Sequence, residues 1–207
     1  MAMTGPPVKA VFFDIGNVLL RFDPQEVLAK IAGALGRSPH RIARYLWTSL
    51  NIEALERGEF GTDDLYSLFQ DKLDYKGDFA QFKKLWCDHF TLQRRTAALL
   101  KQVSRRIPTY LLSNTNALHY DFIRKRYAFT RHVHGMVLSH EVGMRKPEPR
   151  IFRAALRLAK VARPAQAVFI DDLELNVRAA RKAGLKAILY RGPADLRRRL
   201  EGFGVLG

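Results

Sequence analysis

The chain has 207 residues, enough for one domain or for a core domain that carries an inserted subdomain. Hydrophobic residues make up 47% and charged residues 27% of it, a balance that supports a packed core and excludes a disordered or low-complexity chain. The single cysteine excludes an intramolecular disulfide, and no uncharged apolar run approaches the roughly 20 residues of a membrane span. Because the N-terminus also lacks the pattern of a signal peptide, we expect a soluble, cytoplasmic protein without a membrane partner.

The net charge of +15 favours anionic partners such as nucleic acid, an acidic membrane surface or phosphorylated substrates. The basic residues are nevertheless divided among short clusters on predicted helices, such as Arg105-Arg106 and Arg197-Arg198-Arg199. They form neither one tail nor one stripe interleaved with aromatic residues, as a nucleic-acid surface would. Solvated helix faces therefore explain the charge better than a nucleic-acid partner does.

The first predicted element is a strand over Lys9–Phe13, where the apolar run is unbroken. Residues 22–100 then show helical patterns and no convincing strand. Helix starts in this part are indicated by capping residues followed by favourable first turns, at Asp23, Ser38, Thr62 and Asp78. Several aromatic residues of this part are expected in its core, some of them lining a substrate pocket: Phe79, Phe82, Trp86 and Phe90.

Strands and helices alternate from residue 107 onward. The predicted strands are Ile107–Ser113, His132–Ser139, Ala165–Ile170 and Lys186–Tyr190. The predicted helices are Ala117–Tyr127, Pro149–Ala162, Leu173–Ala183 and Pro193–Leu200. Because apolar strands without alternation are buried on both faces, this pattern predicts a parallel sheet between helices. We therefore expect an α/β core over residues 1–21 and 101–207, with an inserted helical subdomain over residues 22–100.

Polar side chains follow three of the predicted strands directly. Asp14 follows the first strand, Ser113 and Asn114 end the second, and Asp171 and Asp172 follow the fourth. In open parallel sheets the ligand crevice forms at the carboxyl ends of the strands, so we expect these side chains in one place. Clustered carboxylates repel one another unless a cation neutralises them, and a carboxylate pair with waters and a substrate phosphate is the usual setting of Mg²⁺. The sequence therefore predicts a magnesium site.

A lysine adds to this set. Lys146 lies in the segment Gly143-Met144-Arg145-Lys146-Pro147-Glu148-Pro149, just before a predicted helix. Near the carboxylates it would balance their charge and hold a phosphate oxygen. A lone lysine is more often a surface residue, so the assignment depends on the company of the three acids.

Four segments, in order along the chain, resemble the motifs of the haloacid dehalogenase-like hydrolases. They are Phe12–Leu19 (FFDIGNVL), Leu111–Asn114 (LLSN), Gly143–Phe152 (GMRKPEPRIF) and Phe169–Asn176 (FIDDLELN), the last followed by Ala183-Gly184. The resemblance covers nearly the whole chain. With a helical insert after the first motif, it is that of subfamily IA, and it implies a Rossmann-like core with an all-helical cap.

The resemblance also implies catalytic and phosphate-binding roles. Asp14 would attack phosphorus and become an aspartyl-phosphate, which water then hydrolyses. Ser113 and the backbone of Asn114 would hold phosphate oxygens. Lys146 would stabilise Asp14 and the charge of the transferring phosphoryl group.

The same resemblance implies a ligand set for Mg²⁺. Asp14 and the backbone carbonyl of Gly16 would bind the ion, together with Asp172. Counted back from Ala183-Gly184, Asp172 matches the main metal-binding acid of the fourth motif, and Asp171 is the neighbouring candidate. Asn176 stands in the place of the second acid of that motif.

Gly16 departs from the family pattern, which usually has a second aspartate two residues after the nucleophile. That aspartate protonates the leaving group and then activates water, and such a positioned group contributes ~10²–10⁴-fold to the rate. Three interpretations remain open. The substrate has a good leaving group, such as a sugar anomeric phosphate; another acid, Asp23 or Glu174, replaces it; or the protein is a slow or inactive relative. Members with a similar Asp-x-Gly-Asn-Val motif resemble sugar-1-phosphate phosphatases.

We therefore predict a magnesium-dependent phosphatase that acts on a small phosphorylated metabolite, a sugar phosphate among the candidates. One alternative is a haloacid dehalogenase, in which Asp14 attacks carbon without a metal. Another is a catalytically weak protein that binds a phosphorylated ligand or nucleic acid, because Gly16 lacks an acid. The expected oligomeric state is a monomer or a homodimer.

Overall fold

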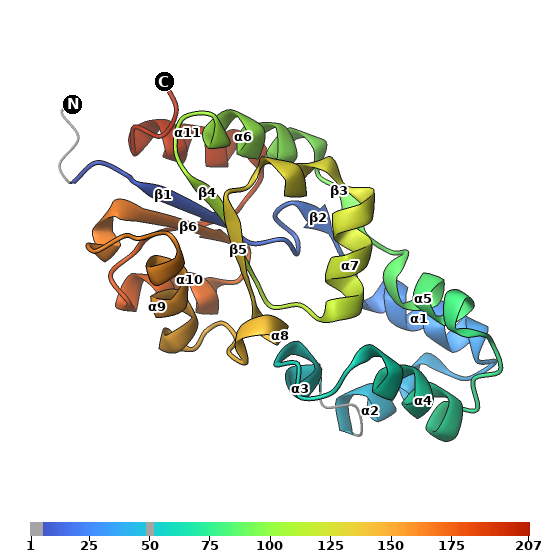
Figure 1. Cartoon of the computed structure of the whole chain (residues 1–207). Helices are drawn as coiled ribbons and strands as arrows, with labels where there is room; N and C mark the ends of the chain where they lie inside the picture. Colours follow the sequence, from blue (N-terminus) through green and yellow to red (C-terminus); the bar gives the residue numbers. More distant parts are fainter. Residues whose placement is uncertain (1–5, 49–51) are drawn as a thin grey trace.

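The computed structural model describes residues 6–48 and 52–207, the side chains of 46–48 excepted. Its larger part has three layers, with a parallel sheet between two layers of helices (Figure 1). The strands of this sheet are β1 (Ala10–Phe13), β4 (Thr109–Ser113), β5 (Gly135–Leu138), β6 (Ala167–Asp171) and β7 (Lys186–Leu189). They follow one another across the sheet in the order β5-β4-β1-β6-β7, so β1 lies at its centre. The predicted α/β fold with a parallel sheet is confirmed.

Helices cover both faces of the sheet. The helices of this part are α6 (Arg94–Ser104), α7 (Ala117–Arg126), α8 (Ser139–Val142), α9 (Pro149–Leu158), α10 (Glu174–Lys182) and α11 (Pro193–Gly202), with the 3-10 turns η1 (Ala128–His132) and η2 (Pro164–Gln166). Successive side chains of a strand point to opposite faces. Val11 and Phe13 therefore share a hydrophobic cluster with α6, α7 and α11, whereas Ala10 and Phe12 share one with α9 and α10. This double burial explains why the strands are unbroken apolar runs.

The smaller part is a helical cap, inserted after β1. Its elements are β2 (Leu20–Arg21), α1 (Pro24–Ala34), α2 (Pro39–Thr48), α3 (Ile52–Glu56), α4 (Thr62–Leu73), α5 (Phe79–Cys87) and β3 (Thr91–Leu92). A hydrophobic cluster of its own, in which Phe69 and Phe82 are fully buried, holds these helices together. In Figure 1 the cap helices lie to one side of the sheet, beyond α7 and α8. The expected helical insert is therefore present.

The predicted helix starts in the cap are close to those observed. Asp23 and Asp78 cap α1 and α5 with their carboxylates, and the Ser38 hydroxyl accepts a hydrogen bond at the start of α2. Helix α4 begins one residue earlier than predicted, because Gly61 rather than Thr62 is its N-cap. In this chain, side chains that can accept hydrogen bonds from first-turn amides therefore indicate where a helix begins.

Two predicted elements differ from the structure. The expectation of no strand within residues 22–100 is wrong, because β3 pairs antiparallel with β2. A strand of two residues is too short to leave a periodic pattern. The strand expected over His132–Ser139 begins only at Gly135, since η1 occupies the chain up to His132. Phe129 anchors that turn in the core, which ends the extended run earlier than its apolar residues indicate.

Helix α6 crosses the predicted boundary at residue 100. Leu99, Leu100 and Val103 belong to the hydrophobic cluster on one face of the sheet. The division into 1–21 with 101–207 and 22–100 stays a prediction, and this packing favours a cap that ends before Arg94.

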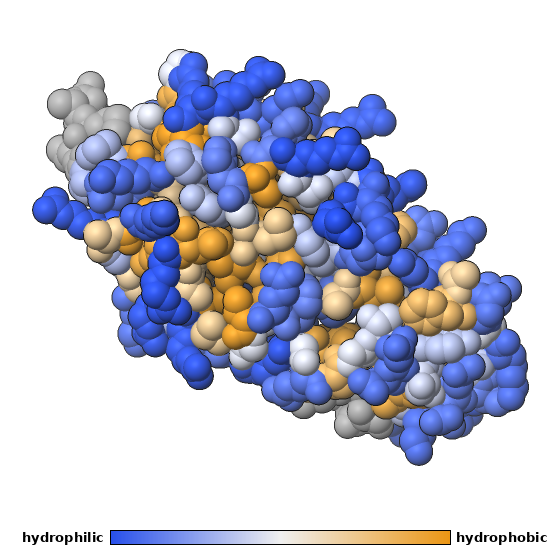
Figure 2. Space-filling model, in the orientation of Figure 1, coloured by the Kyte–Doolittle hydropathy of each residue, from blue (hydrophilic) through white to orange (hydrophobic). Residues whose placement is uncertain are grey.

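The described surface is mostly hydrophilic over α6 and α11 (Figure 2). Some of its positive charge is paired locally, as Arg198 and Arg199 both form ion pairs with Asp195 on the same helix. Among the described residues, no helix combines the length and the apolar character that a membrane crossing requires. Residues 1–5, which carry much of the expectation about a leader peptide, lie outside the described residues.

Candidate active site

The carboxyl ends of three neighbouring strands carry the candidate site. Asp14 directly follows β1, Ser113 is the last residue of β4, and Asp171 is the last residue of β6. Because β4, β1 and β6 are adjacent and parallel, all three ends lie at one edge of the sheet. Asp14, Asp171 and Asp172 lie close together there, with one carboxylate oxygen of each within 4.8 Å of the others. The structure therefore brings together the acids that the sequence placed after separate strands.

Lys146 joins this cluster from the loop before α9. Its Nζ lies 2.8 Å from Asp14 Oδ1 and 2.6 Å from Asp171 Oδ2. The side chains of Lys146 and Asp171 are 1% and 0% exposed, so the pair lies deep in the molecule. Charges removed from water to this extent need close partners, and each of these two has one. The lysine is a member of the site and not a surface residue.

The carboxylate of Asp171 accepts hydrogen bonds from three residues. Besides Lys146, its carboxylate accepts hydrogen bonds from the Leu173 backbone N–H at 2.9 Å and from Asn176 Nδ2 at 3.0 and 3.2 Å. Asn176 is itself buried. Asn176, which stands in place of an acid of the fourth motif, thus orients Asp171. Asp171 in turn orients Lys146.

Asn114 fixes the lysine loop from the other direction. Its Oδ1 accepts a hydrogen bond from the Lys146 backbone N–H at 2.8 Å, and its Nδ2 donates to the Lys146 carbonyl at 2.9 Å. The side chain is therefore occupied, which leaves the backbone of Asn114 for the predicted phosphate contact. The sequence placed Asn114 at the site but did not indicate this side-chain role.

Burial sets the protonation of the acids. The pKa of Asp14 is raised to about 7, chiefly because burial desolvates its carboxyl group. The nearby Asp171 contributes to this rise, and Lys146 opposes it. Burial by itself would lower the pKa of Lys146, but Asp14 and Asp171 raise it, so the amine stays charged. Burial also raises the pKa of Asp172, with a further contribution from Asp171. The site is thus short of positive charge.

The residues present fit a divalent cation. Three carboxylates and one ammonium group carry a charge of −2 when all are ionised, which is −3 from the acids and +1 from Lys146. Oxygen ligands in such a cluster suit Mg²⁺. The hydrogen bonds of Asp171 point to Lys146 and Asn176, which favours Asp14 and Asp172 as the main ligands. The carbonyl of Gly16 stays a predicted ligand.

Both proposed substitutes for the missing acid form contacts within or next to their own helices. Asp23 accepts hydrogen bonds from the backbone N–H groups of Gln25 and Glu26 as the cap of α1. Glu174 forms an ion pair with Arg178 on the exposed side of α10, at 3.0 Å. Both side chains therefore have structural partners, as their positions in the sequence favoured.

Ion pairs join the cap to the loop that carries Lys146. Arg145 contacts Glu56 at 2.7 Å and Glu53 at 2.8 Å, and Arg57 contacts Glu148 at 2.6 Å. We call these three contacts the cap latch. They flank Lys146 on both sides, so α3 is held against the active-site loop.

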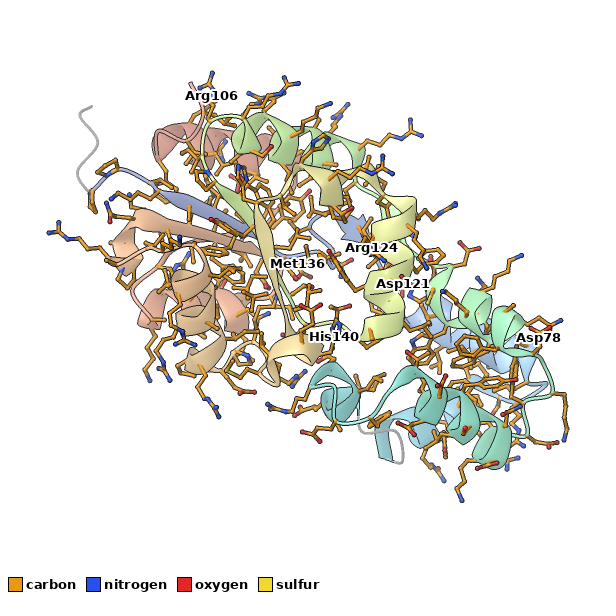
Figure 3. The ribbon with its side chains drawn as sticks, in the orientation of Figure 1. Asp78, Arg106, Asp121, Arg124, Met136 and His140 are labelled. Carbon is orange, nitrogen blue, oxygen red and sulfur yellow. The ribbon has the colours of Figure 1, made fainter. Side chains whose placement is uncertain are left out.

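The backbones also meet closely beside the latch. A Cβ at Gly58 would lie 2.3 Å from the carbonyl oxygen of His140, and the φ of +70° at Gly58 also favours glycine. Figure 3 shows His140 where α8 approaches α3. No local sequence pattern indicates this contact, because Gly58 and His140 are far apart along the chain.

A cavity of about 300 Å³ lies between the cap and the core. Gly16, Ser113 and Asn114 line it at the core end, and residues of α1, α3, α5 and α7 and of the segments next to α1, α5 and α7 line the rest. Of the four aromatic residues expected in the cap core or the pocket, Trp86 and Phe90 line the cavity and Phe82 is fully buried in the cap. The expectation is wrong for Phe79, which is 38% exposed at the start of α5. The site therefore opens into a chamber that the cap encloses.

Residues 8–184 match the family model described as haloacid dehalogenase-like hydrolase, and the chain belongs to this family. Solved structures agree on the fold. A haloacid dehalogenase family enzyme from Bacteroides thetaiotaomicron is 21% identical with a TM-score of 0.84, over 94% of this chain and 99% of that one. The same enzyme has been solved in complex with magnesium and inorganic phosphate, where the TM-score is 0.79 at 23% identity, over 89% of this chain and 95% of that one.

Of two relatives with named activities, one matches over most of its length and one over a small part. A sesquiterpene phosphatase from Aspergillus oryzae is 26% identical over 182 residues, which cover 86% of this chain and 87% of the relative. Bifunctional epoxide hydrolase 2 from Rattus norvegicus is 40% identical over 72 residues, which cover 35% of this chain and 13% of the relative. The chain thus spans only a small part of that longer protein.

Proposed function

We propose that the protein is a magnesium-dependent phosphatase, which hydrolyses the monophosphate ester of a small metabolite through an aspartyl-phosphate on Asp14. The buried contact of Lys146 with Asp14 and Asp171, beside Asp172, carries the proposal. Gly16, Ser113 and Asn114, which belong to the same motifs, line the cavity between cap and core. The phosphatase name of the Aspergillus relative and the magnesium and phosphate bound by the Bacteroides enzyme support it. The helical cap supports placement in subfamily IA.

Each residue has a definite part in the reaction. A carboxylate oxygen of Asp14 forms a bond to phosphorus while the bond from phosphorus to the leaving oxygen breaks, and water later hydrolyses the acyl phosphate. Lys146 offsets negative charge on the phosphoryl oxygens. Ser113 and the backbone of Asn114 bind these oxygens.

Asp14, Asp172 and the Gly16 carbonyl would hold Mg²⁺, with Asp171 beside them. When bound, the ion neutralises charge on the transferring group. The leaving oxygen receives no proton from residue 16, which favours a leaving group that departs readily. The sugar 1-phosphate remains one candidate on this ground.

The test compares wild type with Asp14→Asn on 4-nitrophenyl phosphate, with magnesium and with EDTA. We expect turnover with magnesium only, and a loss of at least ~10³-fold in the variant, because the nucleophile is gone. Asp63→Asn, an exposed acid of the cap, is the matched control and keeps full turnover. Magnesium should also raise the unfolding temperature of wild type more than that of Asp172→Asn.

Other outcomes would replace the proposal. Release of halide from a 2-haloacid in EDTA, lost in Asp14→Asn, would indicate the dehalogenase. Phosphate binding without turnover of any ester would indicate a binding protein. Turnover that Asp14→Asn leaves unchanged would exclude an aspartyl-phosphate on this residue.

A further inference from the structure

The wall of the cavity differs in character from its core end. On the cap side it is formed by apolar side chains of α1 and α3 and of Phe22, two residues before α1: Phe22, Val27, Leu28, Ile31, Ile52 and Leu55. All of them except Phe22 also help to build the hydrophobic cluster of the cap. Such a wall offers contact area to a hydrocarbon surface and no hydrogen bonds.

Three polar residues of the wall already have partners: Asn116, His119 and Glu56. Asn116 Oδ1 accepts from the His119 backbone N–H at 3.0 Å, and its Nδ2 lies 3.1 Å from His119 Nδ1. The other ring nitrogen of His119 lies 3.1 Å from the Trp86 carbonyl. Because Asn116 Nδ2 can only donate, His119 Nδ1 accepts and Nε2 donates. Glu56 is engaged in the cap latch.

The histidine rings of the wall are uncharged. Burial lowers the pKa of His119 to about 4 and that of His89 to about 3. Both ring nitrogens of His89 are buried, with no hydrogen-bond partner among the described residues. Covered in this way, the ring presents an aromatic surface to the cavity.

His89 is part of a continuous set of aromatic rings. Its ring centre lies 4.4 Å from that of Phe90 and 5.2 Å from that of Phe22. Phe90 lies 5.2 Å from His119, which stacks on Trp86 at 5.6 Å and 19°. All five rings line the cavity. Aromatic walls of this kind bind flat or branched hydrocarbon groups well.

From this contrast we propose that the leaving group of the substrate is a bulky apolar alcohol, and that the enzyme selects it over a sugar of the same size. The inference rests on the proposed function, since the phosphate is placed at Asp14. A sugar in this chamber would lose water from several hydroxyl groups, while the described wall returns few hydrogen bonds. A hydrocarbon group makes no hydrogen bonds to water, so its transfer from water into the cavity is favourable. At about 30 Å³ per water molecule the cavity has room for about ten waters, enough for a substituted ring.

Two phosphate esters of primary alcohols test this selection. Glucose 6-phosphate and cyclohexylmethyl phosphate are both primary esters attached to a six-membered ring, and they differ mainly in the hydroxyl groups and the ring oxygen. We expect kcat/KM with magnesium to be at least about tenfold higher for cyclohexylmethyl phosphate. Because residue 16 supplies no proton, both esters could turn over slowly. The inhibition constants of both against 4-nitrophenyl phosphate are therefore measured too, with the same tenfold preference expected.

Turnover of 4-nitrophenyl phosphate distinguishes failure of the proposed phosphatase activity from failure of the proposed selection for an apolar leaving group. If that reagent is not hydrolysed, the proposed function fails. If it is hydrolysed but the two esters bind equally, or the sugar ester binds more tightly, the selection for an apolar leaving group is wrong.

A pair of cap variants locates the preference. Leu28→Asn places an amide on the cavity wall and should lower the preference at least about fivefold. Leu68→Asn makes the same change on α4, among partly buried cap residues outside the cavity lining, and should leave the preference unchanged. Equal loss in both variants would indicate general damage to the cap, and an unchanged ratio in Leu28→Asn would contradict selection by this wall.

Discussion

The two ends of the cavity bury polar groups in opposite ways. At the core end, which we call the phosphate end, buried Lys146 donates a hydrogen bond to the carboxylate of Asp171 at 2.6 Å. At the cap end, burial keeps His119 and His89 neutral, with pKa values lowered to about 4 and about 3. Under the proposed function, charge is thus concentrated where phosphorus would react and absent where the rest of the substrate would lie.

This difference assigns the two tasks of the enzyme to different segments. Electrostatic interactions at the phosphate end are stronger because the surrounding wall excludes water. The apolar wall at the cap end offers few hydrogen bonds and therefore adds little to the affinity for polar substrates. Changes at the phosphate end should therefore alter the rate for every ester, and changes at the cap end should alter the choice among esters.

The most severe test of this division removes the buried lysine. Lys146→Met leaves Asp14 and Asp171 without their cation, so we expect turnover of all esters to fall by about 10²–10³-fold. Breaking a buried ion pair should also cost about 3–5 kcal/mol in the free energy of unfolding, measured with urea. Lys182→Met, an exposed change on α10, is the control. A variant that lost activity for one ester class only would contradict the separation of tasks.

An added acid should strengthen the phosphate end. A Cβ at Gly16 meets no atom within 4 Å, so an aspartate there finds open space. We expect Gly16→Asp to raise kcat for alkyl esters by about 10²-fold, through protonation of the leaving oxygen, and to change 4-nitrophenyl phosphate much less. Gly16→Asn has the same shape without a titrating proton and serves as the matched control. Equal effects of the two variants would show that residue 16 acts by shape alone.

Acid should destabilise the cap end. The pKa of His119 falls from 6.5 in the unfolded chain to about 4 in the folded protein, chiefly because of burial. Between these values the unfolded chain binds the extra proton, so stability is complete above pH 6.5 and is lost as the pH falls towards 4. The difference of 6.5 minus about 4 corresponds to at most about 3 kcal/mol.

Urea unfolding from pH 7 to pH 4 measures this loss. The decrease should be smaller in His119→Phe, whose side chain does not titrate, and unchanged in His40→Gln, an exposed residue of α2. Parallel curves for wild type and His119→Phe would assign the acid sensitivity to other groups.

The sequence predicted the phosphate end well because its chemistry follows strand ends. Asp14, Ser113 and Asp171 each come directly after or at the end of an apolar strand, and parallel pairing is enough to bring them together. The layered core followed from the same strands. Helix starts in the cap followed from capping residues such as Asp78, whose partners are near in sequence.

The cap end depends on contacts that no local pattern encodes. Arg145 reaches Glu56 of the cap over 89 residues, and even at the phosphate end Asn114 reaches Lys146 over 32 residues. The wall of the cavity consists of apolar side chains that have the same spacing as those of an ordinary helix core. Which of them face the chamber is decided by how the cap packs on the core. The expectation of a sugar substrate came from Gly16 and from the resemblance of its motif to that of sugar-1-phosphate phosphatases, and the cavity wall is the observation that weighs against it.

The cap latch should produce the smallest effect, and it connects the two ends. Arg145 and Glu56 have side chains about one-fifth exposed, and their pairing is worth about 1 kcal/mol or less. Glu56→Gln should therefore raise KM about two- to fivefold by loosening α3, with kcat for 4-nitrophenyl phosphate nearly unchanged. Glu59→Gln, whose carboxylate lies 4.0 Å from Arg57 and is more exposed, is the control.

Ionic strength gives this last prediction its sharpest readout. Salt screens exposed ion pairs, so the KM of wild type should rise as NaCl is raised from 50 mM to about 500 mM, towards the value of Glu56→Gln. The variant, which has lost the pair, should respond less. If kcat fell as strongly as KM rose, the latch would position Lys146 for reaction, because both are neighbours in one loop, and the two ends of the cavity would then be coupled through residues 145 and 146. If neither constant moved, closure of the cap would rest on the apolar wall and the close contact at Gly58.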